Sequence, residues 1–426
     1  MPTTRMRFSI GVLLTPLLGR LALVVASDGG GGGGGRNALA QFALDKILQE
    51  GRDVFGDLDE SAFTSSPPTT SFSEVFTHGY SRHARWMAAL PDGTPLAHLN
   101  IPGTHDAATW NYTQATQDSL AAATRCDGTT PRPARVYRCQ RRSVGASLEA
   151  GIRFFDLRFA LDPLDARLAF WHGPAYLSDR ATLEDVLFAF YGWLDSHPTE
   201  MVLLSLQYES GTRGPNVTSD AGVQRKLFDV LTSSVARQYI HQARGVLATL
   251  GDARGKIVLF RRFDLDALPA EFEESLPGLH MAPGKWIDNS PRGFELVYNA
   301  TIKNGSAFVE DYYHPDGFDT VPANIDAKFD AVGAHLRQAA AGDLDHLFVT
   351  FTSGTHVEVD PPVYPDVMAL GSGGGGLGGL GPPAAVRGVN GRLLDLLGEM
   401  RGSRLGVVVM DFFEEPDGLV DLLLDF

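Results

Sequence analysis

The stretch GIRFFDLRF at residues 151–159 places an aspartate and an arginine inside a run of large apolar side chains. A short apolar run of this kind predicts a strand that is buried on both faces, as the strands of parallel sheets are. Asp156 and Arg158 would be costly to bury without partners. We therefore expect this strand to carry them for a purpose other than packing.

Seven more apolar runs share this rhythm, each followed by a polar turn and often by a helical pattern. In the helical segment at residues 182–198, Thr182 is a predicted N-cap and Pro198 lies beyond the end. Eight buried strands alternating with helices predict an α/β fold, an irregular TIM (β/α)8 barrel in a single catalytic domain. An open doubly wound sheet is the alternative, but no GxGxxG phosphate turn follows a strand. The seven runs are AHLNI (97–101), RLAFWH (167–172), MVLLSLQY (201–208), KIVLFRRF (256–263), SAFVEDYY (306–313), HLFVTFTS (346–353) and LGVVVMDFF (405–413).

The first 27 residues resemble a secretory signal peptide, because Arg5 and Arg7 precede an apolar run that ends in small residues. A signal anchor is the alternative, since Arg20 interrupts the apolar run. Four Asn-X-Ser/Thr sequons support a secreted, extracellular glycoprotein. The sequons lie at Asn111, Asn216, Asn299 and Asn304.

The remaining chain divides into a leader and a barrel. Residues 28–84 are rich in Gly, Ser, Thr and Pro and predict a low-complexity, partly disordered leader with one short amphipathic piece. Residues 85–426 then form the barrel domain. A Gly-rich tract at 370–383 cannot be a strand or helix interior and predicts a flexible loop insertion.

The two cysteines, Cys126 and Cys139, flank a segment rich in Thr, Pro and Arg. In an oxidising compartment they would form a structural disulfide that closes one short loop and contributes about 3 kcal/mol. Two cysteines without neighbouring histidines make a poor zinc site, and we predict no metal there.

The formal net charge of −15 argues against a nucleic-acid partner, because such proteins need clustered Lys and Arg. An acidic surface also weakens electrostatic attraction to anionic membranes. Peripheral contact with a membrane would therefore depend on a shaped site and a few placed cations. We expect a monomer.

Polar side chains recur where the predicted strands end, which is the edge where TIM barrels gather their chemistry. Any one of these side chains alone could belong to an ordinary ion pair or an exposed strand end. Their shared placement at the strand ends is what indicates an active site. The candidates are His105, Asp106, Asp156, Arg158, His172, Gln207, Glu209, Arg262, Asp311, Tyr313 and Asp411.

Two histidines and an arginine suit the cleavage of a phosphodiester by an internal hydroxyl. One imidazole would remove the hydroxyl proton, the other would protonate the departing oxygen, and the guanidinium would neutralise charge on the phosphorane oxygens. Carboxylates beside the imidazoles fix their tautomers and raise their basicity. Asp106 and Asp411 are placed to do so.

Four separated motifs, in this order, resemble those of the phosphatidylinositol-specific phospholipase C X-domain family. They are LNIPGTHDAATW (99–110), SLEAGIRFFDLRF (147–159), LAFWHG (168–173) and LGVVVMDFF (405–413). The resemblance spans roughly residues 90–426 and implies an irregular TIM barrel.

The resemblance also implies a role for each catalytic residue. His105 would be the general base on the inositol 2-hydroxyl, supported by Asp411, and His172 the general acid, supported by Asp106. Arg158 would bind the phosphate, with Asp156 nearby. An arginine at this position resembles the metal-independent, bacterial-type branch, so no cofactor is expected. The products would be diacylglycerol and a cyclic inositol phosphate.

Substrate contacts carry over less completely. Arg262, Asp311 and Tyr313 match positions that hold the inositol ring in bacterial relatives, although Arg261 is an alternative to Arg262 and Tyr313 could be ordinary barrel packing. Gln207, close to Glu209, stands where those relatives have a lysine, which removes one positive contact.

Two other functions stay open. A glycerophosphodiester phosphodiesterase shares the barrel and two histidines but places a Glu-x-Asn-type metal cluster near the first motif, so sensitivity to EDTA would separate the two enzymes. A secreted, non-catalytic lipid- or glycan-binding barrel would bind without turnover.

Overall fold

The computed structural model describes residues 33–56, 82–124, 131–164, 166–209, 220–372 and 386–425. The chain forms two compact units, residues 1–44 and residues 45–426, and the second carries the candidate site. Helix α1 (Gly33–Phe55) begins in the first unit and ends in the second. The predicted signal peptide and Cys126 lie outside the described residues.

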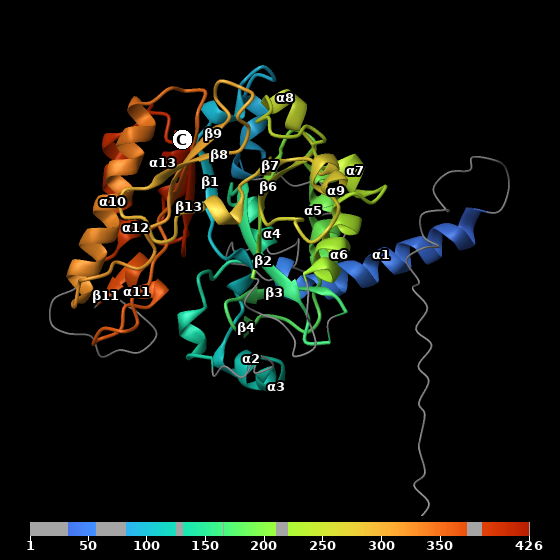
Figure 1. Cartoon of the computed structure of the whole chain (residues 1–426), viewed down its shortest axis with the longest axis horizontal. Helices are drawn as coiled ribbons and strands as arrows, with labels where there is room; N and C mark the ends of the chain where they lie inside the picture. The colour runs from blue at the N-terminus through green and yellow to red at the C-terminus, as the bar shows by residue number, and fades with distance from the viewer. Residues whose placement is uncertain are drawn as a thin grey trace, which may run out of the picture. The chain divides into compact units, whose positions relative to one another are not determined.

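A curled sheet forms the centre of the second unit (Figure 1). Its strands follow the order β7-β6-β5-β2-β1-β13-β10-β9-β8, and every neighbouring pair along this path is parallel except β8 and β9. Among the described residues no ladder joins β7 to β8 or β9, so the barrel is open at that seam. The bounds are β1 (Ile101–Thr104), β2 (Phe154–Leu161), β5 (Val202–Tyr208), β6 (Ile257–Arg262), β7 (Leu279–His280), β8 (Phe294–Val297), β9 (Ser306–Glu310), β10 (Leu347–Phe351) and β13 (Val407–Met410).

The predicted TIM-type α/β fold is confirmed, with three corrections to its strands. The run at 167–172 forms β3 (Leu168–His172), which pairs antiparallel with the end of β2 and then with β4 (Ala175–Tyr176). It is therefore a hairpin arm and not a barrel strand. The eighth parallel strand is instead β7, which the pattern did not predict because only two residues pair. The first run was placed too early, since β1 begins at Ile101.

Helices cover the outside of the sheet: α10 and α12 lie side by side near β13 (Figure 1), α10 contacts β10, and α5 and α6 each contact β3. Thr182 caps α5 as predicted, because its side chain accepts a hydrogen bond from the Asp185 N–H and the Asp185 carboxylate accepts one from Thr182. The helices are α2 (Gln114–Ser119), α3 (Ala121–Thr124), α4 (Val144–Glu149), α5 (Leu183–Ser196), α6 (Ala221–Leu231), α7 (Ala236–Tyr239), α8 (Leu250–Ala253), α9 (Ala270–Ser275), α10 (Val321–Ala341), α11 (Pro365–Leu370), α12 (Val389–Glu399) and α13 (Leu419–Leu423).

Alternate residues of the strands fill two different cores. In β2, Phe154 packs inside the barrel with Phe260 of β6, whereas Phe155 packs outward against Phe190 of α5. Strands with apolar residues on both faces are typical of a parallel sheet that is covered by helices. This explains why the predicted runs were apolar throughout.

The leader assigned to residues 28–84 reaches too far along the chain. The last turn of α1 packs into the second unit, where Val54 and Phe55 are each 1% exposed and the Phe55 ring lies edge-on to Phe190 at 5.2 Å. Burial of two large apolar side chains stabilises this packing, so an isolated disordered leader does not describe residues 45–56. Residues 57–81 lie outside the described part of the chain.

The ends of the Gly-rich tract are held together. Gly371–Ser372 (β11) pairs antiparallel with Val386–Arg387 (β12), and the residues between them lie outside the described chain. Among the described helices, none combines the length and the apolar character needed to cross a membrane.

Candidate active site

Two neighbouring parallel strands bring His105 and Asp411 together. Thr104 of β1 pairs in register with Met410 of β13, so the next residue of each strand leaves the same edge of the sheet. The His105 backbone N–H donates to the Met410 carbonyl, and the Gln140 side chain donates to the carbonyls of both His105 and Met410. The backbone at this edge is therefore fixed from both sides.

The two nitrogens of His105 have different partners. Its Nδ1 lies 2.8 Å from Oδ1 of Asp411, and its Nε2 lies 2.7 Å from Nη2 of Arg158. Because a guanidinium can only donate, Nε2 must be the acceptor in that contact. Nδ1 therefore carries the ring proton and donates a hydrogen bond to Asp411. This tautomer leaves a basic lone pair on Nε2.

Arg158 is held by three carboxylates. Its Nε lies 3.0 Å from Oδ1 of Asp106 and 3.4 Å from Oδ2 of Asp156, and its Nη1 lies 3.6 Å from Oε1 of Glu209. Asp156 is in turn fixed by the Ser205 hydroxyl, which donates to it at 3.0 Å. The charges in the GIRFFDLRF strand are thus paired, and the guanidinium edge faces the pocket.

His172 approaches the same group from the hairpin arm. Its Nδ1 lies 2.8 Å from the carbonyl oxygen of Tyr137, so Nδ1 carries a proton and donates it. Its Nε2 lies 3.2 Å from Oδ2 of Asp106, and the same oxygen lies 3.1 Å from Nε2 of His105. The two imidazole rings are 6.1 Å apart. Among the described residues, this buried Asp106 oxygen has no partner with hydrogen-bond geometry.

Burial shifts the proton affinities of these groups in opposite directions. Desolvation, with help from Arg158, lowers the pKa of His105 well below its usual value and that of His172 to about 4. Desolvation also raises the pKa of Asp106 to about 7 and that of Asp411 well above its ordinary value. Such perturbed groups in a cleft are typical of an active site.

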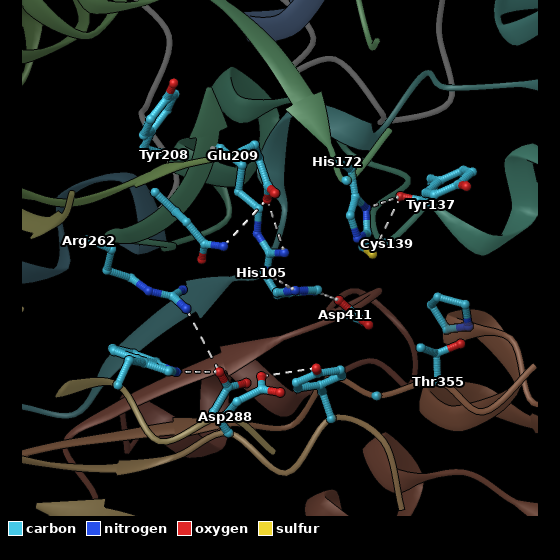
Figure 2. Close-up of a pocket in the computed structure, with 18 of the residues that line it drawn as sticks. His105, Tyr137, Cys139, His172, Tyr208, Glu209, Arg262, Asp288, Thr355 and Asp411 are labelled. Atoms are coloured by element: carbon cyan, nitrogen blue, oxygen red, sulfur yellow. Dashed lines mark hydrogen bonds and ion pairs between the residues drawn. The ribbon is translucent and has the colours of Figure 1, made fainter. Parts of the chain in front are cut away.

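All five predicted substrate-binding residues line one cavity of about 500 Å³ with His105, His172, Arg158 and Asp411. Figure 2 shows His105, His172 and Arg262 converging on this space, with Asp411 next to His105. Asp106 and Asp156 lie behind Arg158 and contact it. The five residues are Gln207, Glu209, Arg262, Asp311 and Tyr313.

One wall of the cavity is built around Arg262. Its guanidinium stacks on the Trp286 ring at 3.8 Å and lies 3.8 Å from Oδ2 of Asp311, which also accepts a hydrogen bond from the Trp286 indole at 2.9 Å. The Tyr313 hydroxyl donates to Asp288 at 3.0 Å. Arg261, the alternative to Arg262, instead pairs with Glu273 and does not line the cavity.

Several residues of the candidate site could not be identified from the strand pattern. Trp286 and Asp288 lie in the long loop after β7, where no strand end marks them, and Thr355 follows the seventh predicted run. Tyr137 contributes a backbone carbonyl, which no sequence pattern reveals. Ser205 sits inside a predicted strand, and only its alternation with buried Leu residues marks it as inward-facing.

The predicted disulfide is not supported. Cys139 is a free, buried thiol that lines the cavity, with its Sγ 3.7 Å from the Tyr137 carbonyl oxygen. The Thr/Pro/Arg-rich segment around Cys139 predicted a short loop closed by a disulfide, whereas the thiol is buried near the carboxylates of Asp411 and Asp106.

His105, Asp106 and Cys139 are close enough together to hold a metal ion, but their chemistry fits one poorly. The Arg158 guanidinium already contacts both His105 and Asp106, and a second cation would be repelled. Burial and the neighbouring carboxylates raise the pKa of the Cys139 thiol, whereas a metal ligand must be a thiolate.

Three of the four predicted glycosylation sites fall on described residues. Asn111 donates to the Asp53 carbonyl, Asn299 to the Gly245 carbonyl and Asn304 to Asp345, and each side chain is half-buried. Asn216 lies outside the described residues. Glycosylation and secretion stay predictions.

No family model matches the sequence. The chain is 32% identical over 180 residues to the 1-phosphatidylinositol phosphodiesterase of Listeria monocytogenes, an alignment that covers 41% of this chain and 47% of that protein. It is 22% identical over 277 residues to the 1-phosphatidylinositol phosphodiesterase of Staphylococcus aureus, covering 63% of this chain and 74% of the relative. The chain thus spans about half the length of the first relative and about three quarters of the second.

The fold matches that of a solved phosphatidylinositol-specific phospholipase C from Staphylococcus aureus. The TM-score is 0.57 at 20% sequence identity, and the alignment covers 80% of this chain and 97% of that chain. The relatives and the shared fold confirm the resemblance that the four motifs predicted.

Proposed function

We propose that this chain, whose relatives and fold are those of the phosphatidylinositol-specific phospholipase C X-domain family, cleaves an inositol phospholipid by internal attack. The single observation that carries the proposal is the convergence of His105, His172 and Arg158 on one pocket. The relatives' names support the substrate class. The mechanism below follows from the contacts of these three side chains.

His105 is the general base. Its Nε2 lone pair accepts the proton of the inositol 2-hydroxyl as that oxygen attacks phosphorus, and the imidazolium that forms is stabilised by Asp411 through Nδ1. The low pKa of His105 keeps it unprotonated, and so competent, at neutral pH. Attack forms the new bond between phosphorus and the 2-oxygen.

His172 is the general acid. As the bond between phosphorus and the glycerol oxygen breaks, Nε2 of His172 takes the proton of the Asp106 carboxyl and passes it to that oxygen, and diacylglycerol leaves. The proton is held close by, because Asp106 lies 3.2 Å from this nitrogen and its pKa is raised to about 7. The other product is inositol 1,2-cyclic phosphate.

Arg158 stabilises the transition state. Its guanidinium can turn the edge that now contacts His105 toward the non-bridging phosphate oxygens, while Asp106 and Asp156 hold its position from behind. A phosphate anion also offsets the positive field of Arg158 on His172, which raises the proton affinity of the acid once substrate is bound.

The wall around Arg262 would bind the inositol ring. Asp311 and Tyr313 offer an acceptor and a hydroxyl to ring hydroxyls, and Gln207 supplies neutral hydrogen-bond capacity where bacterial relatives have a lysine. The Trp286 ring supports Arg262 and gives the cavity an apolar wall. Secretion and a monomeric state belong to this proposal as further expectations.

The test is an incubation of the protein with phosphatidylinositol vesicles in EDTA, followed by phosphorus NMR. We expect cyclic inositol phosphate to appear, and none to appear with His105→Ala. A glycerophosphodiester phosphodiesterase would lose its activity in EDTA and give no cyclic product. A non-catalytic lipid-binding barrel would bind the vesicles and leave the phosphorus signal unchanged. Either result would contradict the proposal.

A further inference from the structure

A second group of metal-ligating side chains lies at the rim of the pocket, outside the proposed mechanism. It consists of His314, His356 and Glu358, and one ligand atom from each lies within 4.8 Å of the other two. His314 directly follows Tyr313, and His356 directly follows Thr355, and both of those residues line the cavity. The group therefore joins two loops that shape the pocket.

His356 is oriented by a buried amide. Its Nδ1 lies 2.7 Å from Oδ1 of Asn324, and the Asn324 amide nitrogen donates to the carbonyls of Phe318 and Thr320. Since that amide nitrogen is committed to two acceptors, Oδ1 must accept and His356 Nδ1 must carry the proton. The lone pair is then on Nε2, which has no hydrogen-bond partner among the described residues although His356 is only 7% exposed.

His314 is oriented by a carboxylate. Its Nδ1 lies 2.8 Å from Oδ1 of Asp316, whose other oxygen accepts from the Asn289 amide at 3.0 Å. Its Nε2 lies 3.1 Å from Oε2 of Glu358. A histidine that donates one ring N–H to a carboxylate and turns the other nitrogen to a third ligand has the usual environment of a metal-bound imidazole.

A charged His314 between two carboxylates would account for part of this arrangement without a metal. It does not account for His356, which is 7% exposed as a residue and whose Nε2 lone pair receives no hydrogen bond from the second imidazole, 4.3 Å away between ring centres. A cation among the three ligands satisfies all of them at once. The structure offers two such imidazoles and one carboxylate, and this ligand set suits zinc.

We propose that His314, His356 and Glu358 form a Zn²⁺ site that fastens the rim of the pocket. Arg132 lies 2.6 Å from the other Glu358 oxygen and would hold that carboxylate in place, which links a third loop to the site. The ion would tie the chain segments after β9 and β10 to each other. It takes no part in bond breaking, because the proposed reaction is carried by His105, His172 and Arg158.

The experiment is a calorimetric titration of the EDTA-treated and dialysed full chain with Zn²⁺, repeated with Co²⁺ while its visible spectrum is recorded. We expect one ion per chain and a four-coordinate cobalt spectrum without a thiolate charge-transfer band. His356→Ala and Glu358→Gln should each weaken binding at least ~10-fold. The Glu358 side chain is 49% exposed, so its variant should fold even if the His356 variant does not.

Two control variants locate the binding. His98→Ala removes a half-buried histidine that also lies 2.9 Å from a carboxylate, that of Asp345, and should leave the affinity unchanged. Cys139→Ser removes a ligand of the other candidate cluster and should also have no effect. The proposal is overturned if excess metal gives no heat, if His98→Ala weakens binding as much as Glu358→Gln, or if Cys139→Ser abolishes it. Turnover measured in EDTA on the same protein tests the proposed function separately.

Discussion

His105 and Asp411 are separated by 306 residues in the chain, yet Nδ1 of the histidine lies 2.8 Å from Oδ1 of the aspartate. The relationship is set by strand register, because Thr104 and Met410 pair directly before them. Since the carboxylate accepts the Nδ1 proton, it decides which nitrogen of His105 is free to act as a base.

Asp411→Asn should therefore impair catalysis without preventing folding. An amide can turn its NH₂ toward Nδ1 and stabilise the wrong tautomer, so we expect kcat/KM to fall on the order of 10² to 10⁴-fold. The measurement is the initial rate of cyclic inositol phosphate formation, with Asp343→Asn on the surface as the matched control. An Asp411→Asn variant with nearly normal rates would show that the contact does not orient the base.

The two histidines should respond differently to the leaving group. With a p-nitrophenyl ester of inositol 1-phosphate the departing oxygen needs no proton, so His172→Ala should recover most of its rate on this substrate. His105→Ala should stay about 10² to 10⁴-fold slow on both substrates, because the attacking hydroxyl must still lose its proton. Equal losses for the two variants on the activated ester would contradict the assigned roles.

The plot of kcat/KM against pH should be bell-shaped and shifted toward acidic pH. Burial lowers the pKa of His105, so the acidic limb should lie below pH 6.5. The proton shared by Asp106 and His172 sits on a pair whose carboxyl pKa is raised to about 7, so activity should fall as pH rises through about 7. Asp106→Asn removes this proton, so activity should be lower and should begin to fall at a lower pH than in the wild type, because His172 alone has a pKa of about 4. A wild-type profile that is flat from pH 7 to 9 would rule out this proton source.

Stability should decline in weak acid, and a buried histidine outside the site should contribute to this decline together with His105 and His172. His335 is 4% exposed, its Nδ1 lies 2.8 Å from the Thr350 hydroxyl, and desolvation lowers its pKa to about 4. Between pH 6.5 and 4 the unfolded state binds a proton at this residue and the folded state does not, so the free energy of unfolding falls as pH falls. The loss should approach about 3 kcal/mol for this residue.

Urea unfolding at several pH values measures this decline. His335→Gln should reduce the slope between pH 6.5 and 4, whereas His98→Gln, whose side chain is 31% exposed, should leave it as in the wild type. If both variants keep the wild-type slope, His335 does not contribute to the decline.

Phe55→Ala should destabilise the barrel, although Phe55 precedes it in sequence. Its ring is 1% exposed and packs against Phe190, so truncation should cost about 3–5 kcal/mol of unfolding free energy. Phe42→Ala, in the same helix but 68% exposed, should change stability by less than about 0.5 kcal/mol. Equal effects of the two variants would place the end of α1 outside the core.

The sequence predicted most of the barrel because burial on both faces makes parallel strands apolar throughout. It misassigned 167–172 because an antiparallel arm packed against the core has the same composition as a barrel strand. It missed Leu279–His280 because two paired residues leave no pattern. Val54 and Phe55 were left in the leader because their burial depends on α5, far along the chain.

The site residues that lie in strands or at strand ends could be predicted from the sequence, and those in the loops could not. His105, Arg158 and Asp411 follow or occupy strands, so their convergence is a consequence of topology. Trp286 is positioned by its stacking on Arg262, and Cys139 by burial beside the carboxylates, and neither relation has a local signal. Local pattern cannot reveal contacts that only tertiary packing creates.

Because β3 turns back along β2, the proposed general acid lies on the β3–β4 hairpin and the proposed general base lies at the end of a parallel barrel strand. His105 follows β1, which pairs with β13 and β2 of the barrel, whereas His172 ends β3, which among the described strands pairs with β2 and β4. Remodelling that arm would alter which alcohol can be expelled while leaving activation of the nucleophile untouched. Leaving-group specificity could therefore change through β3 and β4, while the residues that activate the attacking hydroxyl stay the same.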